Sequence, residues 1–573
     1  MAAILLSMVM LPSCGSDEEE TNSGGSAGGG SGERYNVVLI SLDSVRQDRL
    51  GVYGHVPQYA PNVEVTPVID QLASEGVVFD EAWATSSWTL PSHMSALTGL
   101  SDGAHGVVHD FIKLDPLRET LASRFKSAGY QTAGFYSGPY LDPKYGFGKG
   151  FDFYASGMMS QDDIANEMRK MSDEKAARGE DPALTKMERT MLRDRLSHED
   201  ITSPRINELG MDFLDMTGED PFFLFLHYFD AHYDHIPEKM EPGLGKKFDP
   251  NYSGNFSPDR WYFNPAVREI NQQTRQIKRN ISERDLGHIM AWYDAEIHWV
   301  DRHIGKVVQR LKEMGVYDNT IIAIMADHGD EFFEHGNIGH RSTLWPEVCK
   351  IPLVIRVPGN AAPGKRVNNV MRLYDLAPSL IDLAGLPAMV DVEGVSVREL
   401  IDNDNAEPRG MISNLSQIAQ AGRQKWMAQT TQMWRDPRFS IHRRLAAKPF
   451  TDGTDQRPMF GHVSTFPKPG GGNTYYQFFD RQNDPGEHKP LPLSHPEFAP
   501  TLERFVTEAR RLQQIQNGLT QSHSKDRWPP ELSQEDIKML NDLGYTDAAQ
   551  MGSASSFRLP AFAPYPVPLK SGY

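Results

Sequence analysis

Residues 35–43 read YNVVLISLD, a run of β-branched and other apolar residues that ends on a carboxylate. A continuous apolar run of this length is typical of a strand buried on both faces of a parallel sheet, which would place Asp43 at the carboxyl end of that strand. The pattern recurs at 221–230 (PFFLFLHYFD) and at 320–328 (TIIAIMADH), and a further strand is expected at 131–138 (QTAGFYSG). The chain is therefore expected to build a sheet around these four strands.

Helical patterns separate the predicted strands. They fall at 67–75, at 118–128 and near 283–314, and in the last of these the apolar residues share one helical face. Strands that alternate with helices predict an α/β fold, with a large central, mostly parallel sheet flanked by helices.

Changes in composition mark the predicted domain boundaries. The main α/β domain is expected to span 35–404, with a charged, Met-rich insertion at 156–200 and a polar, aromatic-rich insertion at 236–282. Both insertions could wall a site at the edge of the sheet. Short strands and Pro/Gly-rich loops then predict a smaller C-terminal α+β subdomain over 405–549 and a tail over 550–573.

The charge balance restricts the possible partners. Asp and Glu number 76 against 58 Lys and Arg, which gives a formal net charge of −18. Such a surface repels nucleic acid and anionic lipid, and neither is expected as a partner. An anionic substrate would need a local positive charge, which a metal ion could supply.

The N-terminal residues predict a lipid anchor. Residues 2–11 form an apolar run far shorter than the roughly 18 residues that span a bilayer, and the run leads into LPSC, ending at Cys14. Residues 1–14 resemble a bacterial lipoprotein signal, with lipid on the thiol of Cys14 and a flexible Gly/Ser linker over 15–34. We therefore expect a periplasmic or surface lipoprotein of the bacterial cell envelope, which meets the membrane only through that lipid. A disordered, uncleaved start is the alternative.

Acidic residues end three of the four predicted strands. They are Asp43, Asp230 and Asp327, and His328 follows the last of them. A single aspartate after a strand is often only a helix cap or a turn residue. In open α/β sheets, however, ligands bind at the carboxyl ends of the strands, so three acids at one edge indicate a site.

Histidines gather beside the same positions. Nine of the 19 histidines fall in three short windows, at 93–109, 227–235 and 328–340. Neutral imidazoles together with carboxylates are typical ligands of zinc or manganese, whereas calcium prefers oxygen ligands. The sequence thus predicts a divalent-metal site at the carboxyl edge of the sheet.

Eight segments, in order along the chain, resemble motifs of the sulfatase family within the alkaline phosphatase superfamily. They are NVVLISLDSVRQDRLGVYG (36–54), TPVIDQLASEGVVF (66–79), HYFDAH (227–232), YDAEIHWVD (293–301), ADHGDEFFEHG (326–336), IPLVIRVPG (351–359), YDLAPSL (374–380) and FDRQNDPGE (479–487). The resemblance implies an alkaline phosphatase/sulfatase-like α/β fold and a metal-dependent hydrolase that cleaves ester bonds.

One motif departs from the family pattern. The family signature has a Cys or Ser, which becomes formylglycine, two residues before a proline and four before an arginine. This chain reads TLPSHMSALTG from 89 to 99, so that Pro91 matches but Thr89 takes the modifiable position and His93 replaces the arginine. Formylglycine is not made from threonine. A formylglycine enzyme is therefore not expected.

Thr89 is instead expected to act directly as the nucleophile. The resemblance to superfamily branches such as phosphodiesterases and phosphoethanolamine transferases implies that its hydroxyl, activated by a metal ion, forms a covalent intermediate. A threonine ester cannot release its group by elimination, so water must attack the intermediate at phosphorus or sulfur. A helix is expected to start at Ser92, just after Thr89, and its N-terminus would favour an anion.

The resemblance also implies two sets of site residues. The first metal ion would be bound by Asp43, Thr89, Asp327 and His328. A second metal ion or the anion of the substrate would be bound by Asp230, His232 and His340. A protonated His232 or His340 would be the general acid. An imidazole stands here where many sulfatases have an oxygen ligand, so zinc or manganese is favoured over calcium or magnesium. One or two metal ions are expected.

The expected reaction is hydrolysis of a phosphate or phosphonate (di)ester, or of a sulfate ester, on a small molecule, glycan or lipid headgroup. Two alternatives stay open: an arylsulfatase-like sulfuric ester hydrolase without formylglycine, and a catalytically silent lipoprotein that binds a glycan or a partner. A transferase is less expected, because its known members carry membrane helices. Arg46 could contact the anion or hold a loop by an ion pair.

Overall fold

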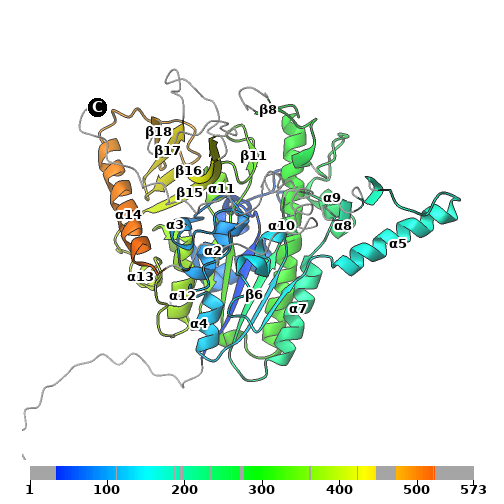
Figure 1. Cartoon of the computed structure of the whole chain (residues 1–573), viewed down its shortest axis with the longest axis horizontal. Coiled ribbons are helices and arrows are strands. Elements are labelled where there is room, and N and C mark those ends of the chain that lie inside the picture. The colour runs from blue at the N-terminus through cyan, green and yellow to red at the C-terminus, as the bar shows by residue number, and fades with distance from the viewer. Residues whose placement is uncertain are drawn as a thin grey trace, which may run out of the picture. The chain divides into compact units, whose positions relative to one another are not determined.

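Eight strands form the central sheet, in the order β13-β2-β12-β9-β1-β6-β4-β5 (Figure 1). The computed structural model of the chain describes residues 34–520 and 522, except for 111, 186, 190, 191, 193, 194, 197, 198, 233, 260, 271–276, 360–362, 422, 423 and 447–472. The strands of the sheet are β1 (Asn36–Leu42), β2 (Val77–Phe79), β4 (Gln131–Tyr136), β5 (Phe153–Ser156), β6 (Phe222–Tyr228), β9 (Thr320–Ala326), β12 (Leu353–Arg356) and β13 (Lys365–Val367). β12 runs antiparallel to both neighbours, and the other pairs are parallel. The sheet is mostly parallel, which confirms the predicted fold class.

The central strands end at one level. β1 lies between β6 and β9, so that Leu42 pairs with Tyr228 on one side and with Ala326 on the other. All seven residues of β1 are buried, as the apolar run predicts. Asp43 and Asp327 directly follow paired residues and therefore emerge together at the carboxyl edge of the sheet.

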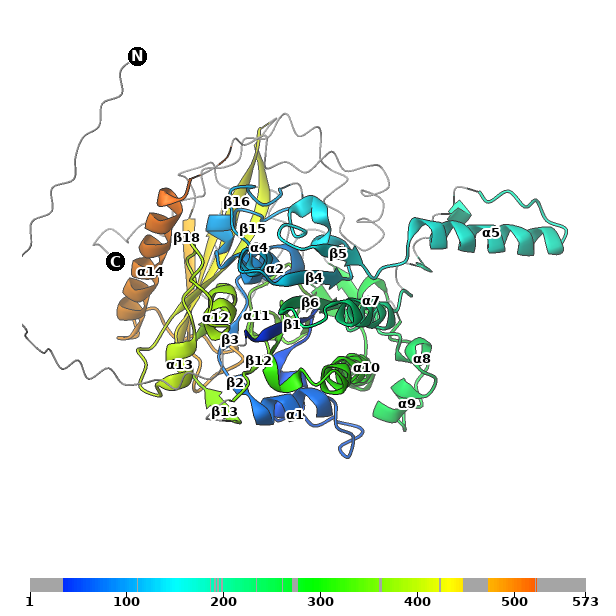
Figure 2. The same ribbon diagram turned by 90° about the horizontal axis from the view of Figure 1, so that it is seen from below.

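Helices cover both faces of the sheet, as Figure 2 shows. One layer contains α1 (Pro67–Glu75), α7 (Ser203–Met216) and α10 (Glu283–Glu313), and the other contains α2 (Thr89–Thr98), α4 (Leu121–Ser127) and α12 (Leu376–Leu383). α10 begins after Ser282, whose hydroxyl accepts a hydrogen bond from the Asp285 amide, and it buries the predicted apolar face. A continuous apolar core joins the sheet to both layers.

Short elements connect these layers. They are β3 (Ala82–Trp83), α3 (Asp102–His105), α8 (Pro237–Met240), α9 (Leu244–Phe248), β7 (Arg268–Ile270), β8 (Ile277–Arg279), β10 (Glu331–Phe332), β11 (Ile338–Gly339), α11 (Pro346–Cys349), β14 (Met371–Arg372) and α13 (Arg398–Asp402). β10 and β11 pair as an antiparallel hairpin. No helix in the described part of the chain is long and apolar enough to cross a bilayer.

The two predicted insertions lie in different places. α5 (Gln161–Ala177), in the first insertion, extends away from the central sheet (Figures 1 and 2). In the second insertion, the buried ring of Trp261 stacks on Phe332 of β10 at a centroid distance of 5.2 Å. The ring of Tyr262 lies against Gly339 of β11. The second insertion therefore packs on the β10–β11 hairpin through Trp261 and Tyr262.

An antiparallel sheet follows the main domain. It consists of β15 (Met411–Ala421), β16 (Gln424–Arg435), β17 (Phe439–Ala446) and β18 (Asn473–Asp480), in that order. α14 (Phe498–Gly518) packs on it through Phe505 and Leu512. The residues described from Tyr35 onward belong to one compact unit, and the boundary at 404/405 stays a prediction. The signal at 1–14, the linker up to 33 and the tail at 550–573 lie outside the described residues.

Glu487 holds the arginines that join the antiparallel sheet to the main domain. Its buried carboxylate lies 3.3 Å from Arg435 and 2.6 Å from His442. The guanidinium groups of Arg435 and Arg481 lie over the ring of Trp83 in β3, at 4.0 and 4.7 Å. Burial opposes ionisation of Glu487, but Arg435 and His442 hold its pKa well below the usual range. The junction thus depends on a buried ion-pair network.

Replacing Glu487 by glutamine is expected to lower the free energy of unfolding by about 3–5 kcal/mol, because the buried Arg435 loses its counter-charge. The exposed Glu503→Gln is the control and should change it by less than about 0.5 kcal/mol. Since the folded state keeps this carboxylate ionised where the unfolded chain binds a proton, the wild-type advantage should be complete at neutral pH and shrink as the pH falls below the ordinary glutamate range. Urea unfolding at about pH 7 and about pH 4 tests both statements. Equal midpoints for the two variants would contradict them.

Candidate active site

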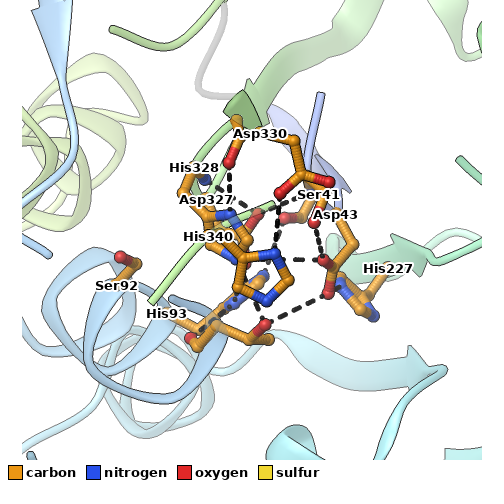
Figure 3. A network of polar contacts seen from close by, with 12 residues as sticks. Ser41, Asp43, Ser92, His93, His227, Asp327, His328, Asp330 and His340 are labelled. Atoms are coloured by element: carbon orange, nitrogen blue, oxygen red, sulfur yellow. Dashed lines mark hydrogen bonds and ion pairs between the residues drawn. The ribbon is translucent and has the colours of Figure 1, made fainter. Parts of the chain in front are cut away.

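Four side chains converge beyond the carboxyl ends of β1 and β9. The hydroxyl Oγ1 of Thr89 lies 3.4 Å from Oδ2 of Asp43 and 3.3 Å from Nε2 of His328. Nε2 of His328 lies 3.3 Å from Oδ2 of Asp327 and 3.9 Å from Oδ1 of Asp43. All four side chains are buried. Figure 3 shows Asp43, Asp327 and His328 directed toward one another.

This arrangement fits a divalent cation. One donor atom each of Asp43, Asp327 and His328 lies within 4.8 Å of the other two. Oδ2 of Asp327 is buried and accepts no hydrogen bond from the described residues. Nδ1 of His328 lies 3.0 Å from the carbonyl of Gly329, to which it donates, so that Nε2 presents its lone pair to the carboxylates. The donor set is one imidazole and two carboxylates, which suits zinc or manganese.

The electrostatics of the cluster also favour a cation. Burial opposes ionisation of Asp43, but His227, His232 and His328 outweigh it and hold the pKa of Asp43 well below its usual range. Burial and the charge of Asp43 raise the pKa of Asp327 far above its usual range. Burial lowers the pKa of His328 to about 3, so this imidazole is neutral at physiological pH. A bound divalent ion would remove the repulsion between the two carboxylates.

The position of Thr89 follows from the start of α2. The helix begins at Thr89 itself rather than at the predicted Ser92, after Trp88 in an extended conformation. Pro91 is tolerated because it lies in the first turn, where an amide has no intrahelical partner. All ten residues of α2 are buried. The hydroxyl of Thr89 is therefore held at the positive end of a fixed helix.

His93, one turn further along α2, supports this corner. Its Nδ1 lies 3.0 Å from the carbonyl of Thr89, to which it donates, and its Nε2 lies 2.8 Å from the hydroxyl of Ser41 in β1. Nδ1 is also 3.4 Å from Oδ2 of Asp327. Burial lowers the pKa of His93 well below its usual range. A neutral His93 thus joins the first turn of α2 to β1 and to Asp327.

His227 was given no individual role by the sequence, although it lies in one of the histidine windows. It belongs to β6 and pairs in register with Ser41. Its Nδ1 accepts a hydrogen bond from the amide of Ser137 at 3.3 Å, which leaves the proton on Nε2, 3.2 Å from Oδ2 of Asp43. His227 therefore orients Asp43, and only the register of β1 and β6 could have identified it.

His340 lies beside His328, and His232 lies beside His340. The ring of His340 is 4.4 Å from that of His328 and 5.2 Å from that of His232. Nδ1 of His340 lies 2.7 Å from Oδ1 of Asp330, a residue that the sequence analysis did not select. His328, Asp330 and His340 form a second group with metal-ligand spacing. The carboxylate beside His328 and His340 is therefore Asp330.

Asp230 does not join the cluster. Its carboxylate accepts hydrogen bonds from the amides of Thr202 and Ser203, at 2.7 and 2.9 Å, and from the hydroxyl of Thr202 at 2.7 Å. The indole of Trp299 adds a fourth hydrogen bond at 3.1 Å. These hydrogen bonds make Asp230 a cap on the start of α7, and its role as a ligand stays a prediction.

Asp230→Ala is expected to lower the free energy of unfolding by about 2 kcal/mol, because the start of α7 loses its acceptor. The metal content should stay unchanged. Asp212→Ala, at an exposed position on the same helix, is the control. Thermal unfolding combined with metal analysis decides the matter. A variant that loses a metal ion but no stability would restore Asp230 as a ligand.

Comparison with known proteins gives four similarities. A family profile described as Sulfatase matches residues 35–386. The chain is 28% identical over 401 residues to an arylsulfatase of Clostridium perfringens, with 66% of this chain and 80% of that protein covered. Among solved structures, the phosphonate monoester hydrolase of Agrobacterium radiobacter is similar with a TM-score of 0.57 and 20% identity, covering 88% and 99% of the two chains. A protein solved with its substrate D-glucosamine-2-N,6-O-disulfate has a TM-score of 0.58 and 18% identity, covering 86% and 100%.

Proposed function

Because the chain belongs to the sulfatase family, in the alkaline phosphatase-like superfamily, and is thus a hydrolase of ester bonds, we propose that it uses Thr89 itself as the nucleophile. The observation that supports this is the place of Oγ1 of Thr89, 3.4 Å from Asp43 and 3.3 Å from His328, inside the cluster that fits a cation. Enzymes of this family use a divalent metal. The family membership also sets aside the alternative of a catalytically silent binding protein.

Asp43, Asp327 and His328 would hold the metal ion. When bound, the ion supplies positive charge that acidifies a hydroxyl and neutralises the oxygens of the reacting group. The oxygen of Thr89 gives up its proton to solvent and attacks phosphorus or sulfur, and the bond to the leaving oxygen breaks. The N-terminus of α2 stabilises the added negative charge. Water then attacks the phospho- or sulfo-threonine and regenerates the hydroxyl.

The leaving oxygen needs a proton. His340 lies beside His328 and His232 lies beside His340, and either can donate a proton when charged. Asp330 accepts a hydrogen bond from Nδ1 of His340, which presents Nε2 of this ring to the site. We therefore assign the general acid to this histidine pair.

We propose a phosphate diester or phosphonate ester as the preferred substrate and a sulfate ester as the second candidate. An unmodified threonine gives an ester intermediate that must be cleaved by water at the central atom, and phosphorus is the atom attacked in branches with such a nucleophile. The Agrobacterium radiobacter hydrolase, named for phosphonate monoesters, supports the first candidate, and the Clostridium perfringens arylsulfatase supports the second. Zinc or manganese is the proposed metal because an imidazole belongs to the donor set.

A panel of 4-nitrophenyl esters tests the substrate. The phosphate monoester, phosphate diester, phosphonate ester and sulfate ester should be compared on chelator-treated enzyme reloaded with zinc, manganese, magnesium or calcium. We expect the highest kcat/KM on a diester or phosphonate with zinc or manganese. A higher kcat/KM on the sulfate ester would instead make the protein a sulfuric ester hydrolase without formylglycine. The mass of the peptide that contains Thr89 would then verify that this residue is unmodified.

We also propose that lipid on Cys14 holds the protein at the bacterial cell envelope. The support is the apolar run that ends in LPSC before the Gly/Ser-rich segment. Cys14→Ser should release the protein from washed membranes of an expressing bacterium. Wild-type protein in the soluble fraction would contradict the anchor.

A further inference from the structure

The turn of the β10–β11 hairpin faces side chains from two other parts of the chain. His335 lies in this turn, Glu347 lies in α11, and His488 follows β18. One donor atom of each residue lies within 4.8 Å of the other two. Nε2 of His335 and Oε2 of Glu347 are 3.5 Å apart. The hairpin turn, α11 and a segment distant from both in sequence therefore bring two imidazoles and one carboxylate together.

Two of these donor atoms lack hydrogen-bond partners among the described residues. Nε2 of His335 and Oε2 of Glu347 are both buried and unpartnered, and each of the two side chains is only 9% exposed. A buried polar atom without a partner destabilises a fold by about 1–3 kcal/mol. Two such atoms that face each other at 3.5 Å point to a ligand between them.

The ring of His335 is oriented for metal binding. It hydrogen-bonds the backbone of Gly486, and because Nε2 is unpartnered this bond belongs to Nδ1. A backbone carbonyl on the distal nitrogen is the usual support of a metal-binding histidine. The ring also stacks between Trp345, at 3.9 Å, and His488, at 4.5 Å. The lone pair of Nε2 is thus aimed at Glu347.

Arg46 does not compete for Glu347. Arg46, whose charge reaches Glu347, is paired with Asp48 at 2.6 Å and with Glu334 at 2.5 Å. Of the two roles considered for Arg46, the structure thus shows the ion pair that holds a loop. Glu347 is left as the carboxylate of the hairpin cluster.

We propose that His335, Glu347 and His488 bind a second type of divalent ion, of the zinc class, apart from the catalytic cluster. Two imidazoles and one carboxylate suit zinc. Tetrahedral bonds of about 2.0–2.1 Å place ligand atoms about 3.3 Å apart, close to the observed separation of His335 and Glu347. The exposed His488 closes the site by a side-chain movement, and water completes the fourth position.

The site would connect the two parts of the molecule. Asp330 precedes β10 and His340 follows β11, so the hairpin that carries His335 at its turn begins and ends at the catalytic cluster. An ion at the turn ties this hairpin to α11 and to the segment after β18. Its role is to fix the hairpin, not to react with substrate.

Zinc stoichiometry of the full chain tests the proposal. Chelator-treated protein should be reloaded with Zn²⁺ and analysed by mass spectrometry of the metal and by titration. His488→Gln and Glu347→Gln should each hold one ion fewer than wild type, with affinity at this site weakened at least about 100-fold, since loss of an outer-shell partner alone costs up to that much. His495→Gln is the control: this histidine lies on the same segment, but its ring contacts Phe439 and Phe478.

A fourth variant separates the two metal sites. Asp327→Asn should lose catalytic ions and keep the ion at the hairpin. Each of the two proposals can therefore be tested even if the other fails. Zn²⁺ should also slow hydrogen exchange at residues 333–337 in wild type and in Asp327→Asn, but not in His488→Gln. If Glu347→Gln fails to fold, the exposed His488→Gln decides. Equal zinc content in wild type, His488→Gln and Glu347→Gln would overturn the proposal.

Discussion

Replacing Thr89 by alanine is expected to lower kcat by about 10³-fold or more, because the reaction loses the atom that attacks the ester. The protein should stay folded, since the change removes only a hydroxyl and a methyl group at the start of α2. The hydroxyl contacts Asp43 and His328, both of which remain in place. Steady-state kinetics on the best ester of the panel, together with a far-UV CD spectrum, measures both effects.

Two matched variants make this result specific. Thr98→Ala is the same substitution in the same buried helix, where the hydroxyl only donates to the carbonyl of Met94. It should keep kcat within about 10-fold, because no reacting atom is removed. Thr89→Ser keeps the nucleophilic oxygen and should retain most of the activity. If Thr89→Ala turned over at the wild-type rate, another group would have to be the nucleophile.

The second large effect is expected from Asp327. Asp327→Asn removes a carboxylate of the cation cluster and should abolish activity and the part of the metal-induced rise in thermal stability that comes from ions at this cluster. For wild type, a metal concentration of 100 times Kd should add about 2.7 kcal/mol. Without metal, the variant should be as stable as wild type or more stable, because asparagine does not repel the buried charge of Asp43.

Differential scanning calorimetry with and without Zn²⁺ or Mn²⁺ measures these shifts. Asp318→Asn, whose side chain is 95% exposed, is the control and should behave as wild type in both conditions. The assigned metal site would be contradicted if no divalent ion raised the unfolding temperature of wild type. It would also be contradicted if Asp327→Asn kept the full rise.

The sequence predicts which residues line the sheet edge wherever a residue directly follows the end of a buried strand. Asp43 directly follows Leu42 at the end of β1, and Asp327 directly follows Ala326 at the end of β9. Leu42 and Ala326 pair with each other, so the two aspartates lie at the same level. Asp230 carries the same sequence signal but comes two residues after Tyr228, one step beyond the level of Asp43. That offset takes its carboxylate to the start of α7. Ligand and helix cap therefore look alike until the register is known.

Other contacts depend on tertiary packing that a sequence does not display. His227 reaches Asp43 because β6 pairs with β1, and Asp330 reaches His340 because β10 and β11 form a hairpin. The start of α2 was predicted three residues late, since Pro91 reads as a break although the first turn accepts it.

The burial of every residue of α2 has a consequence for how such an enzyme changes its substrate. A close-packed helix tolerates few replacements, because each change of volume strains or empties the interior around it. Adaptation to a new ester would therefore leave this helix unaltered and accumulate in the aromatic segment around Trp261 and Tyr262, which packs on the hairpin. Libraries aimed at new specificity should diversify that segment and hold residues 89–98 constant.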